Sequence, residues 1–140
     1  MQMTRRDLFA LAAGLAAVGL IQVPANASED AVEAAIKKFA GGMPETGGVE
    51  IDAPEIAENG NTVPIEVAAA GASSIMILAA GNPNPGVGTF HFSEMCAESR
   101  ASTRIRLATT QDIVAVAKMA DGSTKMARRE VKVTIGGCGG

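Results

Sequence analysis

The sequence predicts a mainly β fold: an immunoglobulin-like antiparallel β-sandwich with a short N-terminal helix and a flexible C-terminal arm. The main observation is a series of short stretches, from about residue 49 onward, in which apolar and polar residues alternate. Gly, Asn, Asp and Pro separate these stretches at the spacing expected of a two-sheet sandwich. Ahead of them, residues 29–40 carry apolar side chains at helical spacing. A chain of 140 residues is long enough for one such domain.

The N-terminal segment has the features of an export signal. The pair Arg5-Arg6 precedes an apolar stretch over residues 8–23, and a small-x-small cleavage site ends at Ala27. The paired arginines make the segment similar to twin-arginine signals. A membrane anchor is the alternative, but the apolar stretch is barely long enough to span a bilayer and contains glycines. We expect a periplasmic protein with no membrane attachment after cleavage. The expected divisions are a twin-arginine signal peptide over residues 1–27, a sandwich domain over 28–135 and an arm over 136–140.

Residues 29–40 are predicted to form the helix. Ser28 is a good N-cap, and Glu29 and Asp30 place negative charge in the first turn, where the helix dipole favours it. The pair Gly41-Gly42 ends the apolar pattern.

The strands follow the helix in close succession. Asp121-Gly122 is typical of a hairpin turn, and the Pro- and Gly-rich residues 81–86 are typical of a loop. In the last strand, alternation predicts that Val131, Val133 and Ile135 face the core. The predicted strands cover residues 49–51, 63–69, 74–78, 89–95, 102–108, 113–119 and 125–135.

Composition excludes several classes of function. Asp and Glu number 15 against 12 Lys and Arg, a balance that argues against a nucleic-acid partner. A single histidine, His91, excludes any multi-histidine metal site. His91, Met95 and Cys96 could form a soft-metal site, but on a strand Cys96 points away from the other two. We therefore predict a buried structural thiol at Cys96, and neither a metal nor a resident cofactor.

The last five residues carry the clearest functional signal. Glycines have no side chain to pack, so this tail is predicted to be mobile and thin enough to enter a narrow channel. An extended chain places the thiol roughly 10 Å beyond Ile135. A thiol held in this way can serve as a covalent tether for a substrate passed between enzymes. The predicted substrate-carrying residue is Cys138, and the residues predicted to give the arm its freedom are Gly136, Gly137, Gly139 and Gly140.

Two disulfide alternatives stay open at this point. Cysteines in an oxidising compartment usually pair, so Cys138 could form an intramolecular bridge with Cys96. It could also link two chains through the exposed tail. Either bond would occupy the thiol that a carrier needs.

The terminal Gly-Gly-Cys-Gly-Gly and the preceding Val-Lys-Val-Thr-Ile resemble the C-terminus of the SoxY family of periplasmic sulfur carriers. The resemblance extends to the leader, the N-terminal helix and the strand over residues 102–108. It implies a carrier, not an enzyme, that forms a heterodimer with SoxZ. It also implies that SoxAX joins thiosulfate to Cys138 as an S-thiosulfonate and that SoxB releases sulfate, leaving a persulfide. SoxCD, where present, then oxidises the remaining sulfur.

Two other classes of function remain as alternatives. A ubiquitin-like sulfur carrier also ends in two glycines, here Gly139 and Gly140, but takes its sulfur as a thiocarboxylate on the terminal carboxyl group. A structural sandwich module would use Cys138 only to crosslink subunits. The position of the sulfur distinguishes these alternatives from a carrier that acts through the Cys138 side chain.

Overall fold

The structure is a computed structural model that describes residues 27–135, and its first element is the helix α2 (Ala27–Ala40). Gly41 adopts a φ of 77° directly after the helix, and its N–H donates to the carbonyl of Lys37. This left-handed residue is the usual glycine stop of a helix. The helix begins before the predicted start, so the prediction of Ser28 as the N-cap is wrong, because Ser28 already lies in the first turn.

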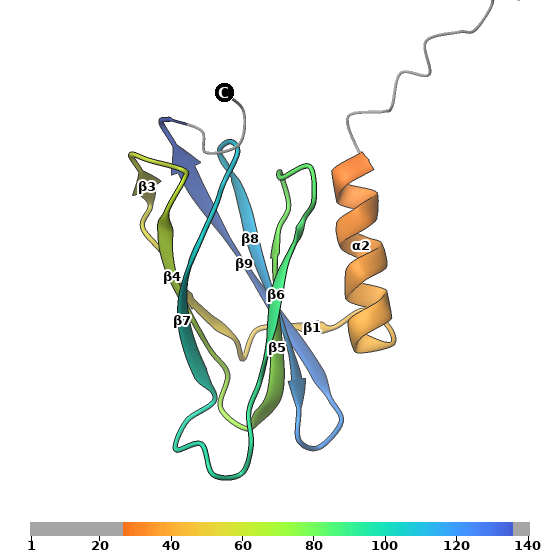
Figure 1. Cartoon of the computed structure of the whole chain (residues 1–140). Helices are drawn as coiled ribbons and strands as arrows, with labels where there is room; N and C mark the ends of the chain where they lie inside the picture. The colour runs from red at the N-terminus through yellow and green to blue at the C-terminus, as the bar shows by residue number, and fades with distance from the viewer. Residues whose placement is uncertain (1–26, 136–140) are drawn as a thin grey trace, which may run out of the picture.

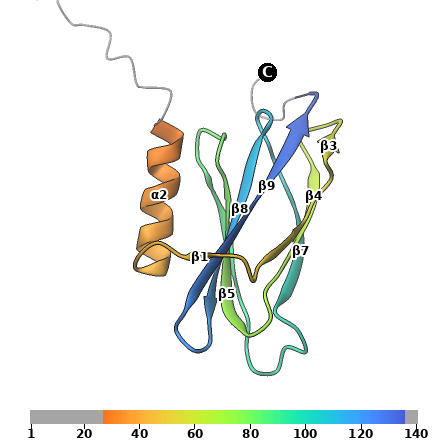
Figure 2. The ribbon, with the colours of Figure 1, turned by 180° about the vertical axis from the view of Figure 1, so that it is seen from behind.

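The remaining elements form two sheets that face each other, with α2 on the outer side of the larger sheet (Figure 1, Figure 2). The predicted immunoglobulin-like sandwich is confirmed. The larger sheet has the order β1-β9-β8-β5-β6, with β3 also paired to β9, and the smaller has the order β2-β4-β7. The strands of the larger sheet are β1 (Glu45–Thr46), β3 (Ile56–Ala57), β5 (Ala72–Ala79), β6 (Gly86–His91), β8 (Gln111–Met119) and β9 (Thr124–Val133). Those of the smaller sheet are β2 (Glu50–Asp52), β4 (Val63–Ala68) and β7 (Arg100–Ile105).

Two strand pairs depart from the predicted antiparallel arrangement. Both β1 and β3 pair in parallel with β9, whereas the longer ladders are antiparallel. Each of these strands has two residues, too few for an alternating pattern to be visible in the sequence. The chain meets the start of β9 as β1, before it enters the smaller sheet as β2, and meets the end of β9 as β3, before it returns to the smaller sheet as β4 (Figure 2).

The core lies between the sheets, and a second apolar layer lies beneath the helix. Ile75 and Ile113 are fully buried in the first layer. Val114 and Val116, on the opposite face of β8, pack with Ile36 of α2 in the second. Because both faces of β5 and β8 are covered, these strands are apolar almost throughout rather than alternating.

The structure corrects two predictions about side-chain orientation. β6 ends at His91, and residues 92–99 form an irregular segment in which the Ser93 hydroxyl accepts a hydrogen bond from the N–H of Met95. Cys96 lies in this segment and is exposed, so the prediction of a buried thiol is wrong. β9 ends at Val133, and Ile135 is 67% exposed, so its predicted inward orientation is also wrong.

The sandwich has two distinct ends, which we call the Ile135 end and the Cys96 end. Antiparallel register places the end of β9 beside the turn that contains Gly60 and the loop over residues 80–85. The opposite end holds the segment 92–99 and the Asp121-Gly122 hairpin turn (Figure 1). Between the two, the β5–β8 ladder runs from Ala72 to Ala79, which at 3.3 Å a residue is about 23 Å.

Candidate functional site

The chain leaves the described part of the structure at Ile135, and hydrogen bonds fix this point. The N–H of Gly60 donates to the carbonyl of Ile135 at 2.7 Å, and the N–H of Thr134 donates to the carbonyl of Ala57 at 3.1 Å. The Gly60 carbonyl in turn accepts from the N–H of Leu107 at 2.8 Å. These hydrogen bonds connect residues 134–135 to β3 of the larger sheet and, through Gly60, to the segment that follows β7 of the smaller sheet.

The residues just before Ile135 are held as firmly. The N–H of Val133 donates to Oγ1 of Thr110 at 2.9 Å, and that of Lys132 donates to the carbonyl of Glu55 at 3.0 Å. Val131 is fully buried between the sheets. These hydrogen bonds and the burial of Val131 fix the position of Ile135, the root of the C-terminal tail.

The predicted carrier residue and its glycines lie outside the described residues 27–135. Covalent geometry still sets the reach of the thiol, because Cys138 is three residues beyond Ile135. Three residues span at most about 11 Å from the α-carbon of Ile135 to that of Cys138. A group carried on Cys138 is therefore confined to the neighbourhood of the Ile135 end.

Cys96, the other cysteine, lies at the opposite end. It lines an open hollow of about 1040 Å³ formed by the segment 92–99, the turn after β4 and the start of β5. Its Sγ lies 3.8 Å from Oγ of Ser93. The separation of the two ends exceeds about 23 Å, twice the reach of the tail. The structure does not bring Cys96 to the root of the tail.

The side chains considered as ligands of a soft-metal site do not lie together in the structure. His91 ends β6, whereas Met95 is 96% exposed in the next segment, so the two do not share the strand predicted for them. Within residues 27–135 no three His, Cys, Asp or Glu side chains gather closely enough to hold a metal ion. Nor does any helix in this range combine the length and apolar character needed to cross a membrane.

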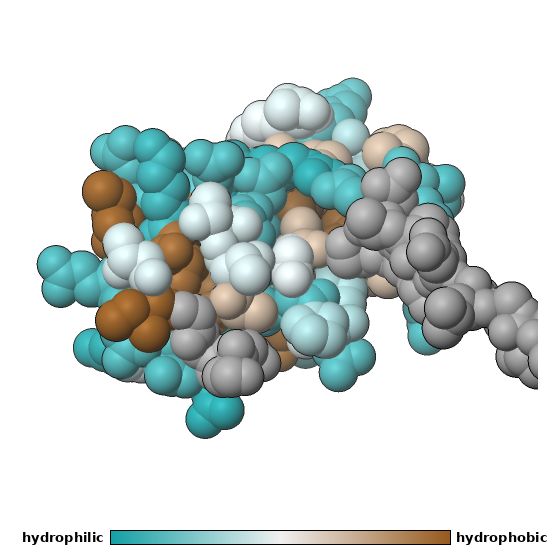
Figure 3. Space-filling model, turned by 90° about the horizontal axis from the view of Figure 1, so that it is seen from above, coloured by the Kyte–Doolittle hydropathy of each residue, from teal (hydrophilic) through white to brown (hydrophobic). Residues whose placement is uncertain are grey.

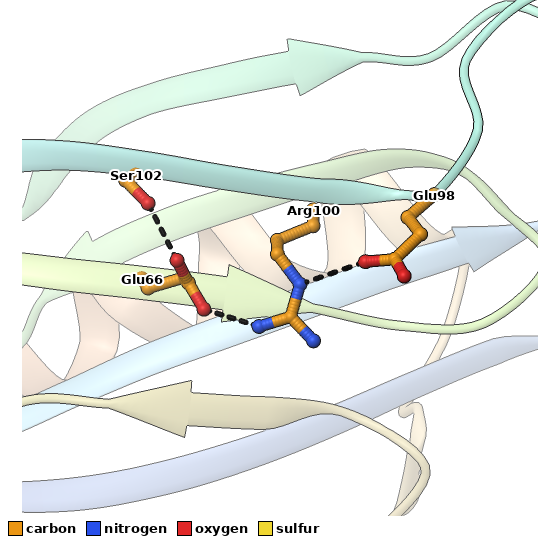
Figure 4. Close-up of polar contacts among 4 residues, drawn as sticks. All are labelled: Glu66, Glu98, Arg100 and Ser102. Atoms are coloured by element: carbon orange, nitrogen blue, oxygen red, sulfur yellow. Dashed lines mark hydrogen bonds and ion pairs between the residues drawn. The ribbon is translucent and has the colours of Figure 1, made fainter.

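Sequence reasoning missed a polar cluster on the outer face of the smaller sheet (Figure 4). The guanidinium of Arg100 pairs with Glu66, and its Nε donates to Glu98 at 3.0 Å. The Ser102 hydroxyl donates to the other Glu66 oxygen at 2.7 Å. These residues come from β4, β7 and the segment before β7, so only the register of the two strands reveals the cluster.

The cluster predicts an acid-sensitive contribution to stability. The hydrogen bond from Ser102 and then the contact with Arg100 lower the pKa of Glu66 from its ordinary value of 4.5. A carboxylate with a lowered folded-state pKa stabilises the fold above its unfolded pKa, and this stabilisation is lost as pH falls through the folded value. The Glu66→Gln variant should therefore be less stable than the wild type at pH 7, and the difference should shrink as the pH falls below 4.5.

Urea unfolding at a series of pH values measures this difference. Glu50→Gln, at an exposed position on the neighbouring strand β2, is the matched control, and its difference from the wild type should be smaller. A difference for Glu66→Gln that stays constant from pH 7 to pH 3 would contradict the assignment.

Comparison with known proteins matches most of the chain to one protein family. The family model described as "Sulfur oxidation protein SoxY" matches residues 36–138. The solved structure of the sulfur carrier protein SoxY from Chlorobium limicola f thiosulfatophilum is 38% identical, with a TM-score of 0.65. That match covers 76% of this chain and 99% of the other.

A more distant likeness concerns the fold alone. A superoxide reductase (neelaredoxin) from Ignicoccus hospitalis is 23% identical, with a TM-score of 0.54, over 75% of this chain and 91% of the other. The comparison with curated protein sequences found no match. The family match and the first structural match therefore agree, whereas the second adds only that the sandwich architecture recurs elsewhere.

Proposed function

Because the chain belongs to the SoxY family of sulfur oxidation proteins, we propose that it carries sulfur derived from thiosulfate as a covalent adduct of Cys138. The coarser statement follows from the family: the protein is a sulfur carrier and not an enzyme. The observation that carries the finer proposal is the extent of the family match, which runs to residue 138 and so includes this cysteine.

The position of the tail root supports the same residue. Hydrogen bonds to Gly60 and Ala57 hold Ile135 and Thr134, so the arm extends from a fixed point. A tether with a fixed root and a reach of about 11 Å presents its thiol to partner proteins without any change in the sandwich. Cys96 lacks this arrangement, because it lies within the segment 92–99 at the other end.

The chemistry requires a thiol that can form and break bonds to sulfur. In the loading step the sulfur of Cys138 joins the outer sulfur of thiosulfate, the thiol proton is released, and two electrons pass to the haem enzyme SoxAX. Water then attacks the terminal sulfonate in SoxB, so that sulfate and a proton leave and a persulfide remains on Cys138. Where SoxCD is present, it takes up six electrons from the outer sulfur, which becomes a sulfonate with three oxygen atoms from water as protons are released. A second hydrolysis then releases sulfate and restores the thiol.

The setting of the proposed carrier is periplasmic. The leader over residues 1–27 resembles a twin-arginine signal, a route that carries folded proteins. A heterodimer with SoxZ formed before export is consistent with that route. The carrier then needs no resident cofactor, because the partner enzymes supply the haem and metal chemistry.

Intact mass of the exported protein, measured with and without reductant and followed by mapping of the C-terminal peptide, tests the proposal. We expect reductant-sensitive additions of thiosulfonate or sulfur on the side chain of Cys138. Sulfur on the terminal carboxyl group of Gly140 would instead support the ubiquitin-like thiocarboxylate carrier. A plain disulfide as the only modification would support the structural module.

A further inference from the structure

Three strands of the sandwich have an edge without a neighbouring strand among residues 27–135, apart from the two-residue strands β1 and β3. In the larger sheet β6 pairs only with β5, and in the smaller sheet β2 and β7 each pair only with β4. Such an edge carries backbone N–H and C=O groups that could bind a strand of another chain, and charged side chains are a common protection against this. The three edges differ in that protection.

The two edges of the smaller sheet are charged. β2 carries Glu50 and Asp52, and β7 carries Arg100 and Arg104, all of them exposed. An antiparallel pair of two copies at either edge would bring acidic side chains against acidic ones, or arginines against arginines. Like charges directly opposite each other destabilise a strand pair. These edges are therefore protected against pairing with a second copy.

The edge of β6 has no such protection. Its six residues include no Lys, Arg, Asp or Glu, and all but one are exposed. A Cβ built at Gly86 or Gly88 meets nothing within 4 Å, so neighbouring side chains leave the backbone open at both positions. The register with β5 shifts between Ile77 and Leu78, and residues 88–91 form the regular part of the strand.

The pairing with β5 determines which backbone groups of β6 stay free. The N–H of Phe92 donates to the carbonyl of Ser73 at 2.9 Å, and the register is unbroken from there to Phe90. Hydrogen-bonded and non-hydrogen-bonded pairs alternate along an antiparallel ladder, so the groups of Phe90 and Phe92 point to β5. The N–H and C=O groups of Thr89 and His91 therefore point away from the sheet.

This edge is complementary to a second copy of itself. In an antiparallel pair about a two-fold axis at Phe90, Thr89 of one chain lies opposite His91 of the other, and each such pair exchanges two backbone hydrogen bonds. No acidic or lysine and arginine side chains meet across the axis. We propose that two copies of the protein join through β6, so that their larger sheets become continuous across the two chains.

The proposed contact is small and leaves both Ile135 ends free. β6 begins after the loop over residues 80–85 and runs toward the Cys96 end, so the Ile135 ends of two antiparallel copies point in opposite directions. Two short strands supply much less than the roughly 800 Å² a side of a stable dimer. We therefore expect a weak dimer that depends on protein concentration. The inference stands apart from the proposed function, because it uses no residue of the tail.

A different self-association has to be told apart from this one. Ile56 and Ile135 are 55% and 67% exposed at the Ile135 end. Figure 3, which looks down on this end, shows apolar side chains gathered over the ends of β3 and β9. Two copies that met through these side chains would not respond to charges placed on β6.

Sedimentation equilibrium of the full mature chain, with reductant present to prevent disulfides, measures the dissociation constant of the dimer. Two double variants place charges at the same two exposed positions of β6. In Thr89→Lys with His91→Lys, lysine faces lysine across the axis, whereas in Thr89→Lys with His91→Glu each lysine faces a glutamate. Thr46→Lys, on the exposed strand β1 at the other edge of the larger sheet, is the control.

We expect the dissociation constant to rise at least about tenfold in the variant with two lysines. It should stay at or below the wild-type value in the variant with lysine and glutamate, and at the wild-type value in Thr46→Lys. The two double variants differ at one residue only, so a folding defect that both share cannot produce this contrast. Amide exchange at Thr89 and His91 should also slow as the protein concentration rises, whereas exchange at Phe90, which is bonded to β5, should not.

Three results would overturn the proposal. The first is equal dissociation constants in the two double variants, which would assign any self-association to another surface such as the Ile135 end. The second is amide exchange at Thr89 that does not depend on protein concentration. The third is a wild-type chain that stays monomeric at about 1 mM.

Discussion

Thiosulfate-dependent growth should be lost when Cys138 is replaced by Ser, while the fold keeps its stability. Serine is nearly the same size as cysteine, but its hydroxyl oxygen cannot form the sulfur–sulfur bond on which loading depends. Within residues 27–135 the buried apolar residues run from Val32 to Val131, so the substitution changes none of these core positions. We expect no thiosulfate-dependent oxygen uptake in cells that express only this variant, and a urea midpoint equal to that of the wild type.

Cys96→Ser is the control for this experiment. It also replaces a thiol with a hydroxyl, but at an exposed position at the other end of the sandwich. Oxygen uptake should remain at the wild-type level. If sulfur oxidation survives in the Cys138→Ser variant, or is lost in the Cys96→Ser variant, the assignment of the carrier role to Cys138 is wrong.

The described residues 27–135 show which parts of the structure the sequence could predict. Long patterns were reliable: the helix and the alternating strand over residues 102–108 were predicted near their observed positions, because burial on one face imposes a period that survives in the sequence. β1 and β3 were missed because a two-residue strand has no period. Their position depends on where β9 runs, which the local sequence does not specify.

Cys96 was misplaced for a related reason. Treating residues 89–95 as one strand that continues to Cys96 led to the prediction of a buried thiol. In the structure, β6 already ends at His91 and a serine-stabilised turn follows. The Glu66–Arg100 pair was missed because its partners are 34 positions apart and meet only through the β4–β7 register. The tail lies outside the described residues, so the carrier arm with its thiol at Cys138 stays a prediction.

The second prediction with a large expected effect concerns the oxidation of the two cysteines. Mild oxidation of the purified mature chain should give disulfide-linked dimers and no intramolecular Cys96–Cys138 bridge. A disulfide needs α-carbons about 4.4–6.8 Å apart. Ile135 lies beyond one end of the β5–β8 ladder and Cys96 beyond the other, so their separation exceeds about 23 Å, whereas the tail reaches about 11 Å.

Only partial unfolding could close this gap. β9 would have to detach as far as Val131, which is fully buried, and lose its pairing with β3 and the bond between Val133 and Thr110. Non-reducing mass spectrometry after treatment with diamide measures the outcome, and the two cysteine-to-serine variants identify which thiols form the dimers. A monomer that has lost two hydrogens, with Cys96 joined to Cys138, would contradict the separation of the two ends. The predicted result means that the fold itself keeps Cys96 away from Cys138 within one chain.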